Sequence, residues 1–586
     1  MIRYRIDVED AHAHLFRVTL VVPRPAAQQR LSLPVWIPGS YLVREFARHL
    51  SAVTATQGGA PVPLAQLDKA TWLAACHGRG ALTVSARVYA FDTSVRAAFL
   101  DANRGFFNAT GLCLRVEGRE QEPQRVELRG LPRGWQVATA LTPVKVDADG
   151  AGVYEAADYD ELCDHPVEMG RFWRGRFDAC GVPHEFVVAG ALPDFDGERL
   201  LADTQKVCEA QIGFWHGAAR RGVAAGRAPF GRYVFLLNTV DEGHGGLEHR
   251  ASTALLAARR DLPQRGRTET TDGYVGLLGL ISHEYFHTWN VKRLRPAEFA
   301  RYDYTRENYT ELLWFFEGFT SYYDDLFLLR AGLIDEARYL KLLAKTISAV
   351  QAAPGRQVQS VAQASFDAWV KYYRPDENTP NSTISYYAKG SLVALALDLT
   401  LRREGRATLD AVMRRLWQAS AGGPIAEADV AAALREIGGR DYADELAAWV
   451  HGTDELPLRP LLEAAGVDWA TSAPTLAQRL GLRVGESALT GVKVTHVLRG
   501  GAGEAAGLAA GDELLGVDGW RLRRLDDALR IVTPGRAAAW LVARDQRLHT
   551  LALTLPAEPA GGAVTLAPAA RASRPALALR KAWAQG

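Results

Sequence analysis

Residues 283–287 read His-Glu-Tyr-Phe-His, a pattern in which two histidines and a glutamate could serve one metal ion. His283 and His287 are four residues apart, so in a helix both imidazoles project from one face. That face can bind a zinc ion and leaves Glu284 beside the open coordination position, where it can act as a general base on water. The alternative is a helix with two buried, hydrogen-bonded histidines and no metal.

A third ligand is expected, because a catalytic zinc site has three protein ligands and one open position. Glu317 lies in segment 314–320, where most neighbours are large apolar side chains. A glutamate is almost never buried without a partner, and a cation at the helix of His283 would supply one. The alternative is a solvated glutamate on an amphipathic helix. The sequence predicts one zinc ion (Zn2+) per chain, held by His283, His287 and Glu317.

These residues resemble one known family. The HExxH motif, followed by Glu-Gly-Phe-Thr at 317–320, is similar to the zinc signature of the gluzincin metallopeptidases, which include thermolysin and the aminopeptidase N family. The interval between the two motifs is longer than in aminopeptidase N and resembles that of the glycyl aminopeptidase family with a C-terminal PDZ domain. Segments 33–41, 287–293 and 367–390 are also similar to that family, so the resemblance covers nearly the whole chain.

The resemblance implies a substrate-binding strand. Residues 245–249 read Gly-Gly-Leu-Glu-His and resemble the Gly-x-Met-Glu-Asn segment of the aminopeptidase N family, whose glutamate binds the substrate amine. Gly245, Gly246 and Glu248 are therefore expected to bind substrate. Leu247 and His249 depart from the family pattern, and the alternative is a glycine-rich loop with a solvated glutamate.

The resemblance also implies a tyrosine that donates to the oxyanion of the transition state. Residues 387–390 are similar to the family's Tyr-x-Lys-Gly, which assigns this role to Tyr387. Tyr386 is a rival, since adjacent helical residues point about 100° apart and only one can face the zinc. Lys389 is expected to be structural or to support the site. Asp324 is a candidate partner for the zinc-binding histidines.

Two regions have the periodicities of different fold classes. Short alternating segments at 2–8, 15–22, 82–89 and 125–128 predict antiparallel strands. Apolar periodicity predicts a strand at 233–237 and helices at 272–291, 309–331, 384–402 and 407–419, with Gly332 and Gly405 as helix ends.

Residues 480–484 and 503–519 closely resemble PDZ domains of the bacterial protease type. Such domains bind a peptide C-terminus by adding a strand, and residues 480–484 would hold its carboxylate. The alternative is a PDZ fold whose groove is unused, because Arg483 stands where many peptide-binding loops have an apolar residue.

The expected fold class is multidomain α+β. It comprises an N-terminal β-sandwich-like domain (1–170), a thermolysin-like, mostly α catalytic domain (171–460), a PDZ domain (470–556) and a poorly determined C-terminal tail (557–586).

Composition restricts the partners and the compartment. The chain has 68 Lys and Arg against 67 Asp and Glu, a formal net charge of +1, which argues against nucleic-acid or anionic-membrane binding. Its 5 cysteines form no CxxC pair, which favours a reducing compartment without disulfides. The first residues alternate like a strand, and no apolar run reaches the ~18–20 residues of a membrane span. The sequence therefore predicts a cytoplasmic protein.

We expect a zinc-dependent aminopeptidase, a hydrolase that acts on peptides with a free N-terminus. The resemblance implies a preference for a small first residue, Gly or Ala. One alternative is a gluzincin endopeptidase, which is favoured if Glu248 points away from the zinc. Another is a PDZ-centred peptide-binding protein with an inactive zinc site.

Overall fold

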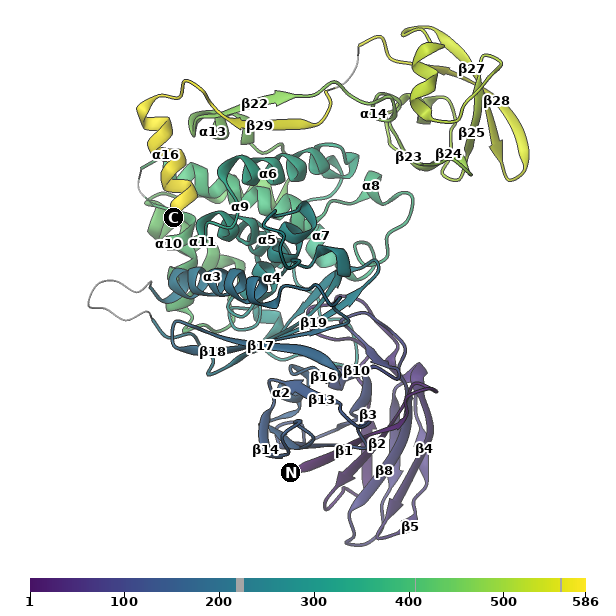
Figure 1. Ribbon diagram of the computed structural model, residues 1–586, viewed down its shortest axis with the longest axis vertical. Coiled ribbons are helices and arrows are strands. Elements are labelled where there is room, and N and C mark those ends of the chain that lie inside the picture. Colours follow the sequence, from purple (N-terminus) through teal and green to yellow (C-terminus); the bar gives the residue numbers. More distant parts are fainter. Residues whose placement is uncertain (218–225, 406, 559–560) are drawn as a thin grey trace. The chain divides into compact units, whose positions relative to one another are not determined.

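The computed structural model of the chain describes residues 1–217, 226–405, 407–558 and 561–586 (Figure 1). The described residues form two compact units. The first comprises residues 1–309, 330–333 and 416–425, and the second comprises residues 310–329, 334–415 and 426–586.

The N-terminal part of the first unit is built from three sheets. An eight-stranded sheet has the order β14 (Thr142–Val146), β15 (Gly152–Ala156), β12 (Gln124–Arg129), β1 (Ile2–Asp10), β2 (Leu15–Val22), β8 (Leu82–Tyr89), β4 (Leu50–Gln57) and β5 (Ala60–Pro61). Two four-stranded sheets have the orders β11 (Arg115–Val116), β3 (Gln28–Ser32), β7 (Thr71–Ala75), β6 (Leu64–Gln66), and β13 (Gln136–Thr139), β16 (Val167–Gly170), β10 (Arg104–Phe107), β9 (Ala98–Leu100). The four predicted strands are present, and alternate residues of β1 are buried as their period requires. The largest sheet is not purely antiparallel, because β1 and β12 run parallel.

A five-stranded sheet follows in the same unit and includes the strand predicted to bind substrate. Its order is β17 (Phe172–Ala179), β18 (Val182–Ala189), β19 (Tyr233–Val240), β21 (Ser252–Ala258) and β20 (His244–Glu248). Strand β20 is therefore an edge strand, and it pairs antiparallel with β21. Helix α4 (Asp272–Phe286) packs on β20 and β21, and α3 (Gly197–His216) packs on β17 and α4.

Helix α4 ends at Phe286, earlier than the predicted end at 291. His287 is its C-cap, and the next amides bond back three residues, with Thr288 donating to the carbonyl of Tyr285 at 3.1 Å. Val291 then has a φ of 120°, which no helix accepts. The second histidine therefore lies at the end of the helix, one turn after the first.

The first part of the second unit is helical and includes two long helices (Figure 1). Helices α5 (Leu313–Arg330) and α9 (Tyr386–Arg403) approach at two glycines, since a Cβ on Gly318 would lie 2.6 Å from the Cα of Gly390. Further helices are α6 (Glu336–Gln351), α7 (Val361–Phe366), α8 (Thr379–Ser382), α11 (Glu427–Gly438), α12 (Ala443–Leu446) and α13 (Leu458–Ala464). The predicted helix at 407–419 is α10 (Leu409–Ala419), and Gly332 and Gly405 have the positive φ of helix ends, at 70° and 73°.

The PDZ-like region also belongs to the second unit. It comprises α14 (Leu476–Leu480), β23 (Leu482–Ser487), β24 (Gly491–Val497), α15 (Ala502–Ala505), β25 (Glu513–Val517), β26 (Trp520–Arg521), β27 (Ala537–Arg544) and β28 (Arg547–Thr554). These elements enclose their own apolar core, which includes Leu482, Leu514 and Trp540. Strand β23 lies at the edge of the sheet.

The C-terminal segment differs from the poorly determined tail that its composition predicts. Strand β29 (Val564–Pro568) pairs antiparallel with β22 (Val467–Thr471), and α16 (Arg574–Gln585) follows. Trp583 is buried, and its Nε1 donates to the hydroxyl of Tyr322 at 2.9 Å. One buried tryptophan and a strand pairing therefore fix a segment rich in Ala and Pro.

The cysteines and the apolar helices bear on the expected compartment. All five cysteines are free thiols. Among the described residues, no helix is both long enough and apolar enough to cross a lipid bilayer.

Candidate active site

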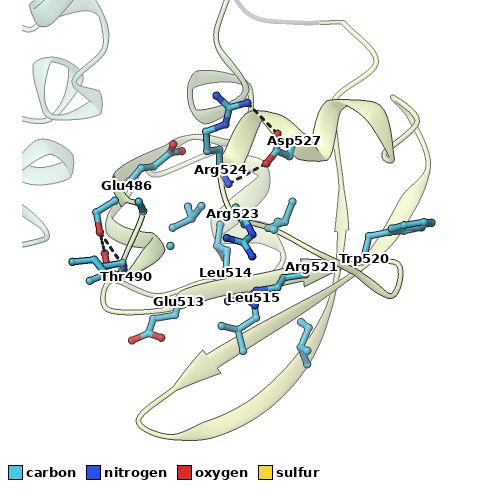
Figure 2. A pocket seen from close by; sticks show the side chains of 18 of the residues that line it. Glu486, Thr490, Glu513, Leu514, Leu515, Trp520, Arg521, Arg523, Arg524 and Asp527 are labelled. Atoms are coloured by element: carbon cyan, nitrogen blue, oxygen red, sulfur yellow. Dashed lines mark hydrogen bonds and ion pairs between the residues drawn. The ribbon is translucent and has the colours of Figure 1, made fainter.

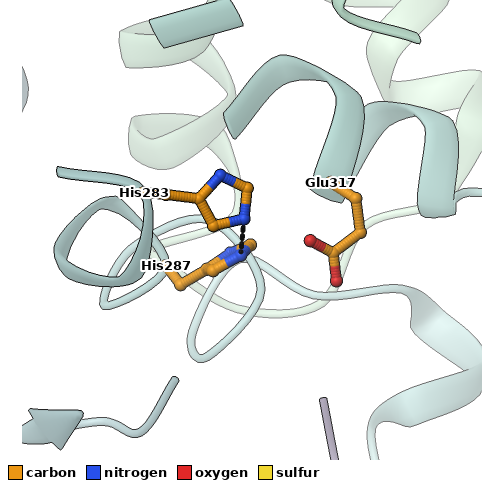
Figure 3. A group of neighbouring side chains, drawn as sticks. All are labelled: His283, His287 and Glu317. Carbon is orange, nitrogen blue, oxygen red and sulfur yellow. Dashed lines mark hydrogen bonds between the residues drawn. The ribbon is translucent and has the colours of Figure 1, made fainter. Parts of the chain in front are cut away.

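The two histidines of the HExxH motif meet at the end of α4. The N-cap Thr271 accepts from the amide of Tyr274 at 3.1 Å and fixes the start of this helix. At the other end, the Nε2 atoms of His283 and His287 lie 3.0 Å apart, with the rings nearly perpendicular (Figure 3). Figure 3 also shows the carboxylate of Glu317 turned toward this pair.

This donor set fits a zinc ion. Nδ1 of His287 lies 2.8 Å from the carbonyl oxygen of Asn290, which can only accept, so Nδ1 carries the proton and Nε2 keeps its lone pair. Ligand atoms of His283, His287 and Glu317 all lie within 4.8 Å of one another. Two ligands at ~2.0–2.1 Å from a tetrahedral zinc would be about 3.3 Å apart, close to the separation of the two histidine nitrogens.

Glu284 is buried directly beneath strand β20. A Cβ on Gly246 would lie 2.6 Å from Cγ of Glu284 and would overlap its carboxylate, so only glycine leaves room at this position. Oxygens of Glu284 and Glu248 and a ring nitrogen of His287 form a second group, also within 4.8 Å of one another. The base predicted from the motif therefore lies beside both a histidine and a second carboxylate.

Glu248 occupies the C-terminal end of β20, opposite Thr253 of β21, and is buried. Gly39, from the N-terminal part of the unit, lies against it: a Cβ there would be 2.5 Å from Oε1 of Glu248. Gly39 also has a φ of 90°, which favours glycine. The segment 33–41 that resembles the family is therefore a wall of the site.

A buried ion cluster supports the residues next to Glu248. Asp164 receives Nζ of Lys292 at 2.6 Å, Nδ1 of His249 at 3.3 Å and the amide of Arg250 at 3.0 Å. Burial alone would raise the pKa of Asp164, but the charge of Lys292 and the bond from His249 hold it well below its usual value. Burial lowers the pKa of His249 to about 4, so this imidazole is neutral near pH 7. Sequence reasoning missed Asp164 and Lys292.

Tyr387 lies close enough to Glu317 to sense its charge. Burial, and after it the negative charge of Glu317, raises the pKa of the Tyr387 phenol well above its usual value. The phenol therefore keeps its proton and remains a hydrogen-bond donor. Its rival Tyr386 is fully buried, stacks against Tyr387 and has its ring tilted by 46° to that of Tyr372, as a packing residue does.

Lys389 and Asp324 are the two residues that the sequence suggests as supports of the site. Among the described residues, Nζ of the buried Lys389 has no hydrogen-bond partner, and burial lowers its pKa. The partner of His287 is the carbonyl of Asn290, a backbone group that the side-chain pattern could not reveal. Asp324 on α5 stays a prediction as a partner of the histidines.

The PDZ-like region contains a large cavity of about 1090 Å³ (Figure 2). It lies at the tip of the β23–β24 hairpin and along β25 and β26, with Glu513, Trp520, Arg521 and Arg523 in its lining. The predicted carboxylate loop, 480–484, does not line it.

The chain resembles known proteins over its whole length. A model of the Peptidase M61 N-terminal domain matches residues 3–171, a model of M61 glycyl aminopeptidase matches residues 276–393, and a PDZ model matches residues 471–533. The crystal structure of an aminopeptidase N family protein from Idiomarina loihiensis is 38% identical, with a TM-score of 0.93, and each chain covers 100% of the other. An M1 zinc metallopeptidase from Deinococcus radiodurans is 14% identical over 78% of this chain and 94% of that one, with a TM-score of 0.48. No curated protein sequence matches the chain.

The fold and these matches define a zinc metallopeptidase of the aminopeptidase class, a hydrolase with an N-terminal β domain, a mainly helical catalytic domain and a PDZ domain. The chain belongs to the M61 glycyl aminopeptidase family.

Proposed function

We propose that this chain removes a small N-terminal residue, Gly or Ala, from peptides with a free amine, using one zinc ion held by His283, His287 and Glu317. The observation that carries the proposal is the close group of Glu248, Glu284 and His287. It puts a buried carboxylate beside the base and the metal ligand. An aminopeptidase substrate brings an ammonium to neutralise that carboxylate, whereas the internal bond that an endopeptidase cleaves brings none.

Glu284 is the base in this proposal. It accepts a proton from the attacking water and delivers it to the leaving amine as the peptide bond breaks. The bound zinc would polarise the scissile carbonyl and lower the pKa of the water. Gly246 packs against the carboxylate of Glu284, which supports a scissile bond at the level of this glycine.

Tyr387 stabilises the transition state. Its protonated phenol donates a hydrogen bond to the oxygen of the scissile carbonyl as negative charge develops there. The raised pKa of Tyr387 supports this assignment, because a phenol that ionised near pH 7 would repel the oxyanion.

The preference for Gly or Ala rests on the lack of space around Glu248. The backbone of Gly39 lies so close to this carboxylate that a single added carbon would clash. The first residue of the substrate, whose amine must reach Glu248, therefore has little room for a long side chain. The name of the matching family model, glycyl aminopeptidase, agrees with this preference.

The PDZ domain would take the C-terminus of a peptide along β23. This strand is at the edge of its sheet, so its free backbone groups can pair with an added strand. Gly481, with a φ of 68°, lies in the predicted loop 480–484 that would hold the carboxylate.

The test is a comparison of glycyl and acetyl-glycyl arylamides with wild type and Glu248→Ala. Acetylation removes the ammonium and leaves the buried carboxylate unpaired, a cost of about 3–5 kcal/mol, or ~10²–10⁴-fold in kcat/KM. Glu248→Ala should lose a similar factor on the free amine and should discriminate much less between the two substrates.

Glu242→Ala is the control, since Glu242 is exposed and pairs with Arg260 at 2.7 Å. It should discriminate like wild type. Equal cleavage of both substrates by wild type would refute the aminopeptidase and favour an endopeptidase. Equal discrimination by wild type and Glu248→Ala would keep the activity and remove Glu248 from its role.

A further inference from the structure

Arg96 connects the N-terminal sheets to the substrate-binding strand. It lies in the segment between β8 and β9, and its Nη2 donates to the carbonyl oxygen of Gly246 at 3.2 Å. Nη1 is 3.7 Å from the place that a Cβ on Gly245 would take. The half-buried guanidinium therefore lies beside both glycines of the edge strand.

The bonding capacity of Arg96 is largely unused. A guanidinium has five N–H donors in a planar fork that matches a carboxylate. Within the described parts of the chain, Nε of Arg96 is buried without a hydrogen-bond partner and no carboxylate forms an ion pair with this side chain. The result is a positive charge beside the strand whose hydrogen-bond donors are only partly used.

The direction of the substrate brings its C-terminal part to this charge. In the function proposed above, the substrate amine binds Glu248 and the scissile bond lies at the level of Gly246, which packs against Glu284. The residues that follow the scissile bond must therefore continue along the edge of β20 toward Gly245. One strand residue spans ~3.3 Å, so the carboxylate of a dipeptide or tripeptide would lie about 7–10 Å from the amine, near the guanidinium.

We propose that Arg96 binds the α-carboxylate of short substrates and makes the enzyme selective for dipeptides and tripeptides with both ends free. Glu248 and Arg96 then bind opposite charges at the two ends of one small zwitterionic molecule, on either side of Glu284. The bond from Arg96 to Gly246 holds the guanidinium at this place before substrate arrives. The proposal rests on the aminopeptidase function given above.

The experiment measures kcat/KM for Gly-Ala and Gly-Ala-Ala and for the C-terminal amide of each. Wild type should prefer the acid over the amide of the same peptide by about 10–100-fold, since a charge-assisted bidentate pair is lost in the amide. Arg96→Gln should bring this ratio close to one, mainly through a higher KM for the acids. Arg96→Lys, which keeps the charge without the fork, should give an intermediate ratio.

Arg174→Gln is the matched control. Arg174 also donates to a backbone carbonyl, that of Val137 at 2.8 Å, but from β17 at the opposite edge of the sheet. It should keep the wild-type ratio. If Arg96 only ties the strand in place, Arg96→Gln would lose activity equally on acids and amides, and the proposal would be wrong.

The outcomes distinguish a failure of the role of Arg96 from a failure of the proposed aminopeptidase function. Wild type that cleaves acids and amides equally would overturn the role of Arg96 and leave the aminopeptidase intact. Wild type that cleaves none of these free-amine peptides would overturn both.

Discussion

The edge of β20 and the cavity of the PDZ-like region use similar side chains in opposite ways. Around β20, Glu248 and Glu284 are buried. Their carboxylates lie against Gly39 and Gly246, where any side chain would overlap them. In the PDZ cavity, the charged side chains of Glu513 and Arg523 are exposed. Buried charges are fixed in position but costly, whereas exposed ones are adaptable and contribute little.

The difference indicates what each region can do. Charges held in place without water are strong in catalysis because they need no reorganisation during the reaction. An open, adaptable surface suits recognition of a flexible chain, whose affinity comes from many small contacts. Substitutions at equivalent residue types should therefore have large effects at β20 and small ones in the cavity.

The largest difference between the two regions is expected when one glutamate in each, Glu284 or Glu513, is replaced. Glu284→Gln should lower the turnover of a glycyl arylamide by several orders of magnitude, because an amide cannot accept the proton of the attacking water. Its zinc content, measured by atomic emission, should equal that of wild type. Glu513→Gln changes the same group in the PDZ cavity and should leave turnover unchanged. Comparable losses in both variants would contradict the proposed base.

The next largest difference between the two regions is expected when Gly246 or Gly485 is replaced by alanine. A methyl group on Gly246 would overlap the carboxylate of Glu284, whereas one on Gly485 of β23 would meet its nearest atom at an ordinary 3.9 Å. Gly246→Ala should therefore displace the base and lower kcat/KM about 10²-fold, the cost typical of a misplacement of about 1 Å. Gly485→Ala should change neither kcat/KM nor the thermal unfolding temperature. Kinetics on one arylamide and thermal unfolding of both variants make the comparison, and wild-type kinetics in Gly246→Ala would refute the close packing.

The residues proposed for the metal site are those that short sequence motifs carry. The four-residue spacing of His283 and His287 is imposed by helix geometry, and Glu317 was conspicuous as one charge among aromatic side chains. The alternating strands β2 and β8 have the predicted bounds, because period-two burial is a local property of the chain.

Contacts between distant segments could not be predicted. Gly39 and Glu248 are adjacent only because a turn and a strand that are far apart in the sequence meet there, and nothing in either segment alone indicates it. Asp164 and Lys292 were missed for the same reason. The C-terminal segment looked undetermined because its composition lacks apolar periodicity, yet one tryptophan, Trp583, anchors it.

The smallest difference between the two regions is expected in how stability depends on pH through His249 and His496. Buried His249 has its pKa lowered to about 4, against ~6.5 when unfolded. Between these values the unfolded chain binds more protons, so stability rises with pH and is lost as pH falls from 6.5 toward 4. For one such group the loss from pH 7 to pH 5 is about 2 kcal/mol. Asp164 stays ionised over this range, since its pKa is well below the usual value.

His249→Asn should therefore lose about 2 kcal/mol less stability than wild type between pH 7 and pH 5, because asparagine does not titrate. The measurement is the opening free energy of β20 and β21 from hydrogen exchange, which reports this sheet rather than the whole chain. His496→Asn is the control: burial and Arg483 lower the pKa of His496 as well, but this histidine is half-buried and lies in the PDZ-like region. It should leave the pH dependence at β20 and β21 as in wild type. An equal loss in wild type and His249→Asn would mean that the imidazole beside Asp164 has the same pKa in the folded and the unfolded chain, and that its burial next to Glu248 does not lower that pKa.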